Sequence, residues 1–116
     1  MVRQWTFRLD WIVPYVRTTQ RQKFVDKRYK RYAEWKAFCR MAASAKGVPE
    51  ALDKRERYEV HVAVYWRGSA RADLDNCVKG LLDALWAQDR RVLKLTAEAI
   101  EHLSKGDWML VTVLET

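Results

Sequence analysis

The sequence has few of the residues that build disulfide frameworks and most zinc centres. Only two cysteines and two histidines occur among 116 residues. Cys39 and Cys77 fall inside expected helices and form no metal-type pair, so we interpret them as reduced packing residues. His61 and His102 lie too far apart in the chain to indicate a zinc site. The composition therefore argues against disulfide-rich and zinc-binding classes of protein.

Long apolar runs are also missing from the sequence. The longest uncharged apolar run, residues 108–114, is far shorter than the ~18 residues that a membrane-spanning helix needs. The first five residues, MVRQW, do not resemble the apolar region of a signal peptide. No internal repeat or low-complexity segment interrupts the chain. We therefore expect a cytoplasmic protein that does not associate with membranes.

Charge is present in quantity and is unevenly spread. The net charge is +7, but residues 1–46 carry 12 Lys and Arg against 3 Asp and Glu, whereas residues 47–116 carry 10 against 12. A basic first half would attract and guide DNA, and an acidic second half would supply carboxylates for metal chemistry. A solvated helix face with ordinary surface charge would give the same counts.

The hydrophobic pattern predicts the order β-α-β-α-β-β. Alternating apolar residues predict strands over residues 4–13 and 58–66, and later ones over about 92–100 and 108–114. Helical spacing predicts one helix from about residue 26 to 45 and a second after residue 73, in which Gly80 indicates a close contact. The expected fold class is α/β (α+β), with residues 1–116 forming a single domain. In it, two helices pack on a mixed β-sheet of about four strands.

A basic loop follows the first expected strand. Arg17, Arg21 and Lys23 alternate with small polar residues between residues 14 and 26. Cations interleaved with hydrogen-bonding side chains suit contacts with phosphate groups, so we expect this loop to bind DNA. A flexible basic loop without such a role remains the alternative interpretation.

An acidic cluster opens the second helix. Asp73 and Asp75 are separated by one residue and are followed by Asn76 and Lys79. The two carboxylates point the same way only from extended backbone, because on a helix they diverge by about 200°. We therefore expect Asp73 to be the N-cap residue, so that the pair straddles the junction of loop and helix. A local alternative is that Asp73 caps the helix, with Asn76 at the capping-box position, and that Asp75 pairs with Lys79.

A further carboxylate, Asp89, follows the second helix. A helix of about twelve residues separates its two ends by ~18 Å. Asp89 therefore joins Asp73 only if the chain doubles back or if a partner subunit supplies it.

The stretch DLDNCVKGLLDAL, followed by QDRRV, closely resembles the signature of the RusA family of Holliday-junction resolvases. That signature is a D-x-D-N-x-x-K helix start, then D-A-L, then an acidic pair shortly before a valine. Aligning Val92 with that valine places Asp89 on the second acid and Gln88 on the first. The family often has Pro-Pro followed by Asn-Arg in the basic loop, where this chain has VPYVRT at residues 13–18.

The resemblance implies a magnesium-dependent crossover junction endodeoxyribonuclease that acts in DNA recombination and repair. Such an enzyme is a homodimer that cuts four-way DNA junctions by paired symmetric nicks. Asp73, Asp75 and Asp89 match the family's metal-binding acids, which would hold Mg²⁺ or Mn²⁺. Lys79 matches its essential lysine, which makes the catalytic set Asp73, Asp75, Lys79 and Asp89. We expect Arg71 to bind DNA together with the basic loop.

Two other functions are compatible with these residues. The first is a less selective, phage-type nuclease that cuts branched or flap DNA with the same catalytic side chains. The second is a basic nucleic-acid-binding module without catalysis, in which the acids only cap a helix.

Overall fold

The computed structural model describes residues 3–16 and 27–116. Its elements, in chain order, are β1 (Arg3–Leu9), α2 (Lys27–Ala45), β2 (Tyr58–Arg67), α3 (Leu74–Leu85), β3 (Val92–His102) and β4 (Trp108–Glu115). The predicted β-α-β-α-β-β order and the α+β fold class are therefore confirmed. None of the described helices is both long and apolar enough to cross a membrane.

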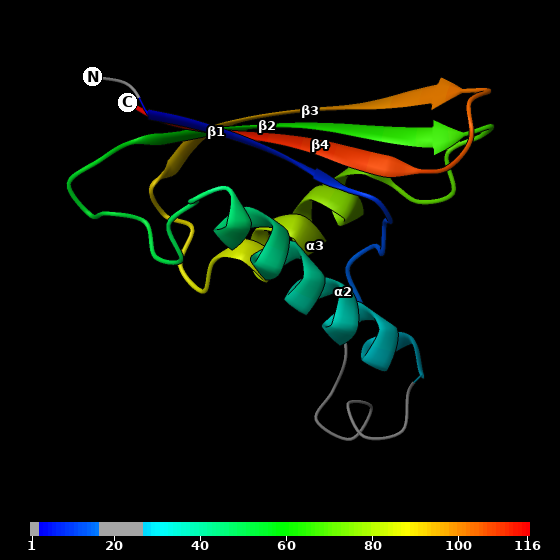
Figure 1. The fold of residues 1–116 in the computed structure, drawn as a ribbon, viewed down its shortest axis with the longest axis horizontal. Helices are drawn as coiled ribbons and strands as arrows, with labels where there is room; N and C mark the ends of the chain where they lie inside the picture. Colours follow the sequence, from blue (N-terminus) through cyan, green and yellow to red (C-terminus); the bar gives the residue numbers. More distant parts are fainter. Residues whose placement is uncertain (1–2, 17–26) are drawn as a thin grey trace.

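The strands form one mixed four-stranded sheet in the order β1-β4-β2-β3. Strand β4 lies antiparallel to both β1 and β2, whereas β2 and β3 run parallel. Parallel neighbours need a crossover connection, and α3 supplies it between β2 and β3. Both helices pack on the same face of the sheet (Figure 1).

The first strand is shorter than the alternation predicted. It ends at Leu9, although the apolar alternation continues through Trp11 to Val13. After Leu9 the chain leaves the sheet toward α2, where the Trp11 carbonyl accepts a hydrogen bond from Trp35 Nε1 at 2.8 Å. Val13 is only 6% exposed. Its apolar character therefore reflects burial in the core and not membership of the strand.

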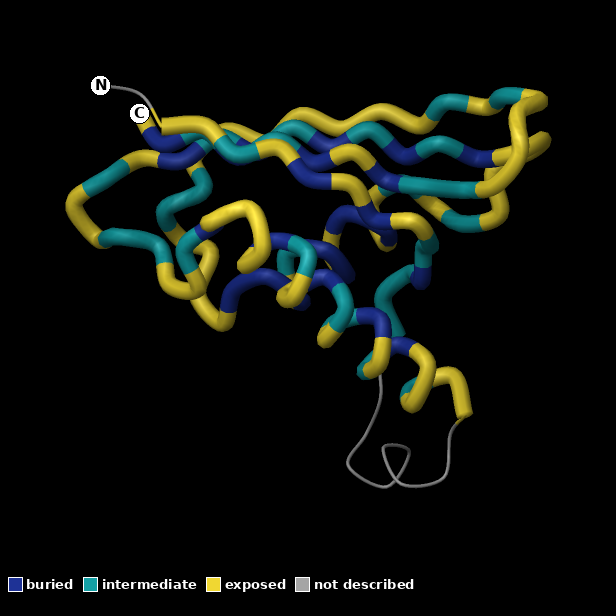
Figure 2. Tube along the Cα trace, viewed as in Figure 1, coloured by how far each residue is buried: buried dark blue, intermediate teal, exposed yellow. Residues whose placement is uncertain are grey.

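The core lies between the sheet and the helices, and Figure 2 shows buried residues along the strands and along both helices. The fully buried side chains come from all the layers and include Leu9, Tyr32, Trp35, Cys39, Val60, Val64, Leu81, Met109, Val111 and Val113. Gly80 allows close packing at the predicted place. A Cβ atom added there would lie 3.2 Å from the backbone nitrogen of Tyr15.

Strand β3 is the least covered part of the sheet. Among the described strands, it forms one edge of the sheet and pairs with β2 alone. Residues 93–99 are all exposed, and Leu93 and Leu95 keep 55% and 43% of their surface accessible. The helices therefore bury the β1, β4 and β2 part of the sheet and leave an apolar edge open.

Candidate active site

The acidic pair lies at the start of α3. Asp73 occupies the N-cap position with extended backbone (φ −65, ψ 139), as predicted, and the helix begins at Leu74. Its side chain makes no capping hydrogen bond. Asp75, in the first helical turn, accepts a hydrogen bond from the Asn76 backbone N–H at 3.0 Å. Both residues are exposed, so their carboxylates face solvent at the positive end of the helix dipole.

Lys79 does not neutralise these acids. Among the residues that the structure describes, no ion pair joins Lys79 to Asp75, which removes the local alternative for that pair. The Lys79 Nζ lies instead 4.3 Å from the centroid of the Tyr15 ring. The ammonium group therefore has an aromatic neighbour and remains available to an anion.

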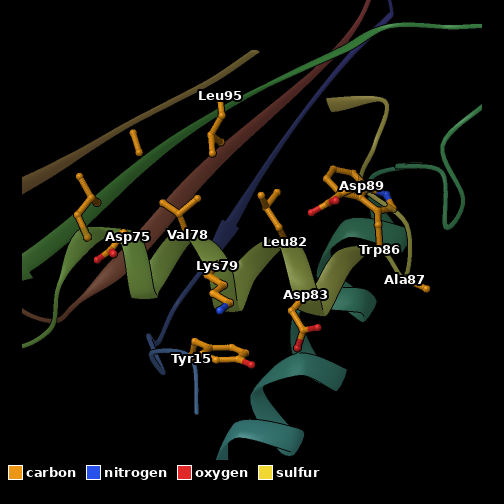
Figure 3. Close-up of a pocket in the computed structure, with 12 residues that line it drawn as sticks. Tyr15, Asp75, Val78, Lys79, Leu82, Asp83, Trp86, Ala87, Asp89 and Leu95 are labelled. Atoms are coloured by element: carbon orange, nitrogen blue, oxygen red, sulfur yellow. The ribbon is translucent and has the colours of Figure 1, made fainter. Parts of the chain in front are cut away.

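A cleft of about 710 Å³ runs along this side of α3 (Figure 3). Its charged lining consists of Asp75, Lys79, Asp83 and Asp89. Its apolar lining comes from α3, from the residues after it and from β3, namely Leu74, Val78, Leu82, Trp86, Ala87, Leu95 and Ala97, and Tyr15 completes it. The cleft therefore combines an apolar floor with a row of charges.

Asp89 lies in the same cleft, but at the other end. Asp75 lies in the first turn of α3, whereas Asp89 lies in the link that follows the helix. The backbone carbonyl of Asp89 accepts a hydrogen bond from the Val92 N–H at 2.9 Å. Within residues 3–16 and 27–116, no three His, Cys, Asp or Glu side chains gather closely enough to hold a metal ion. One chain therefore places Asp73 and Asp75 at the same end of α3 and Asp89 beyond its other end.

Asp83 is a cleft residue that the sequence reasoning missed. It accepts hydrogen bonds from Tyr32 Oη at 2.8 Å and from Lys36 Nζ at 3.3 Å. Burial, followed by the bond to Asp83, raises the pKa of Tyr32 well above its usual value. The spacing of Asp75, Lys79 and Asp83, each four residues apart, was a signal that these residues share one face.

A second, smaller cleft of about 330 Å³ lies beside the start of α3. Arg28 and Arg31 of α2 line it together with Arg71, which is two residues before Asp73. Arg71 forms an ion pair with Asp107 and stacks over Trp66, with its Cζ 5.0 Å from the ring centroid. That ion pair holds the pKa of Asp107 below its usual value. We call this group of residues the arginine cleft.

The remaining predicted DNA-binding residues, Arg17, Arg21 and Lys23, lie outside the described residues. The arginine cleft contains Arg28 and Arg31, which the sequence analysis did not single out.

The acidic pair has the donor chemistry that a hard divalent cation requires. Carboxylate oxygens are the ligands that Mg²⁺ and Mn²⁺ prefer. Within the described chain, neither Asp73 nor Asp75 is engaged by a lysine or arginine. Their charge acts on Cys77, where burial and then both carboxylates raise the thiol pKa to about 11. Within one chain, therefore, two of the three expected ligands, Asp73 and Asp75, have the chemistry to bind a divalent cation.

Comparison of the chain with models of known protein families and with curated proteins finds no match.

Proposed function

We propose that the protein is a Mg²⁺-dependent endodeoxyribonuclease that resolves four-way DNA junctions. The observation that carries this proposal is the pair of exposed carboxylates at the start of α3, which have no cationic partner within the described chain. One of them, Asp75, lines the same cleft as Lys79, a lysine that forms no ion pair with a described residue. The resemblance of residues 73–92 to the RusA family supports the choice of reaction.

Asp73 and Asp75 would hold the metal ion, and Mn²⁺ could replace Mg²⁺. A bound divalent cation would polarise a phosphodiester and make an attacking water more acidic. Lys79 lies one turn along α3 from Asp75, where its ammonium group would stabilise the negative charge that develops on the phosphate. The N-terminus of α3 adds its partial positive charge on the same side.

The position of Asp89 supports a homodimer. The cleft exposes apolar side chains beside β3, an eleven-residue edge strand that has no second neighbour among the strands the structure describes. Exposed edges and apolar patches of this kind are typical of interaction surfaces. In a twofold interface, contacts occur in reciprocal pairs. Two copies packed across this cleft would bring the Asp89 end of one copy to the Asp75 end of the other, and so complete two metal sites.

DNA would approach along the basic side of the molecule. The arginine cleft begins next to Asp73 and carries three guanidinium groups against one carboxylate, that of Asp107. Guanidinium groups bind phosphate oxygens in a bidentate manner. A strand whose phosphate lies at the acidic pair would therefore have guanidinium groups for a further phosphate in the neighbouring arginine cleft.

The proposal is tested with Asp75→Asn. This variant should bind a synthetic four-way junction as the wild type does and lose Mg²⁺-dependent cleavage by a factor of at least about 1000, since it removes charge from the metal site. Asp10→Asn is a matched control, because Asp10 is an exposed aspartate that does not line the cleft and is paired with Arg8. Cleavage by Asp75→Asn at the wild-type rate would leave a basic DNA-binding module as the better interpretation.

A further inference from the structure

Tyr15 occupies a place where the sequence departs from the RusA pattern, and its position is fixed from several sides. Its backbone N–H donates a hydrogen bond to the Asn76 carbonyl oxygen at 3.1 Å, which ties it to the first turn of α3. Its backbone lies against Gly80, where a side chain would bring a Cβ atom within 3.2 Å of the Tyr15 nitrogen. The ring meets the Tyr32 ring edge to face, with centroids 5.9 Å apart.

The acids next to Lys79 on α3 do not hold its side chain. Asp83, four residues later, is bound by Tyr32 and Lys36. Asp75, four residues earlier, accepts the Asn76 N–H and forms no ion pair with a described residue. The Tyr15 ring is left as the neighbour of the Lys79 ammonium, at 4.3 Å, and Figure 3 shows the lysine end directed toward that ring.

From this arrangement we infer that Tyr15 is a positioning residue for Lys79 and, resting on the proposed function, that it orients the ammonium group toward the scissile phosphate. An aromatic face attracts a cation without neutralising its charge, whereas a carboxylate partner would do so. The ring also restricts the flexible four-carbon side chain of Lys79 before substrate binds. Without the ring, the side chain would lose its conformational entropy only when substrate binds. Tyr15 therefore preserves the charge of Lys79 and prepares its position.

The first test uses nuclear magnetic resonance and needs neither metal nor DNA. Protons that lie over an aromatic ring are shielded by it, so the ε-methylene protons of Lys79 should resonate upfield of those of the other lysines. The signal is assigned by its loss in Lys79→Arg. Tyr15→Phe keeps the ring and should keep the upfield shift, whereas Tyr15→Leu should remove it. An ordinary Lys79 shift in the wild-type protein overturns the inference without any variant.

The second test measures cleavage of a four-way junction in Mg²⁺. Tyr15→Leu should lower kcat by about three- to tenfold with KM within about twofold of the wild type, because the ring acts on an interaction made in the transition state. Tyr15→Phe should cleave at close to the wild-type rate, because the hydroxyl group does not face the ammonium in this scheme. Thermal unfolding of both variants checks that the fold is retained.

The two tests separate the two ideas. Normal cleavage by the wild type together with unchanged kcat in Tyr15→Leu overturns the role of Tyr15 and leaves the nuclease proposal standing. A wild type that shows the Lys79 shift and cuts no DNA overturns the nuclease proposal, and with it the catalytic part of the inference.

Discussion

The two faces of α3 contrast in how their side chains are used. The buried face, with Cys77, Leu81 and Ala84 at most 2% exposed, fits against the sheet and α2. The cleft face carries Asp75, Lys79 and Asp83 at four-residue intervals. On an exposed helix, such charges usually pair with one another for about 0.3–0.5 kcal/mol each. Within the described chain they do not pair with one another, so the helix stabilises the fold with one face and keeps the charges of Asp75 and Lys79 available on the other, while Asp83 is bound by Tyr32 and Lys36.

Truncating a buried side chain should give the largest difference in stability between the two faces of α3. Leu81→Ala should lower the free energy of unfolding by about 2–5 kcal/mol, because it leaves a cavity in the core. Leu82→Ala removes the same atoms from the cleft side, where the residue is only partly buried, and should cost about 1 kcal/mol or less in dilute protein. Urea unfolding measures both values. Equal losses would show that the cleft side also belongs to the core.

A charge placed at the open edge should disrupt self-association. Leu95→Lys puts an ammonium group on β3 at the cleft and should weaken the proposed dimer by at least about tenfold, since a buried unpaired charge is costly. Leu110→Lys is the control, because Leu110 is 39% exposed on β4 but alternates with buried residues and so points away from the helices. Sedimentation equilibrium gives the dissociation constants. A monomeric wild type, or equal effects of the two variants, contradicts dimerisation through this cleft.

The arginine cleft should contribute phosphate contacts. Arg31→Gln should reduce the slope of log K against log salt for junction binding by about 1, as expected for one lost phosphate contact. Lys30→Gln changes an exposed neighbour that does not line the cleft and should leave the slope unaltered. Binding titrations between low and moderate salt provide the comparison. An unchanged slope for Arg31→Gln would indicate that Arg31 is an ordinary solvent-exposed residue that makes no phosphate contact.

Cys77, on the buried face of α3, should make the stability of the fold depend on pH. Its pKa is raised from 9.0 to about 11, so the folded state favours the neutral thiol. The stabilisation is present in full below pH 9 and is lost as the pH rises through about 11. Wild-type stability should therefore fall more steeply between these pH values than that of Cys77→Ala. Parallel pH profiles in chemical unfolding experiments would contradict the burial of this thiol.

Local pattern was sufficient to predict much of the molecule. The order of elements, the N-cap position of Asp73 and the close contact at Gly80 follow from periodicity and backbone preference within short stretches. The contact of Tyr15 with Lys79 and the ion pair of Arg71 with Asp107 join residues far apart in the chain. Spacing within one element contains no information about such contacts.

For the same reason, the sequence could not predict how Asp89 and β3 lie relative to the rest of the molecule. Helix length left open whether Asp89 reaches Asp73 within one chain or through a partner subunit, and it could not show that Asp75 and Asp89, near opposite ends of α3, line one cleft. The uncovered edge of β3 depends on where two helices settle on the sheet, which alternation along a strand does not determine.

The most direct test of the central claim is cleavage of a synthetic four-way junction, beside linear and flap DNA, in Mg²⁺ and in EDTA. The proposed function predicts paired symmetric nicks in the junction in Mg²⁺ and no cutting in EDTA. Equal cutting of flap or linear DNA would contradict junction selectivity and favour a less selective nuclease. An intact junction in Mg²⁺, with binding retained, would contradict the nuclease itself.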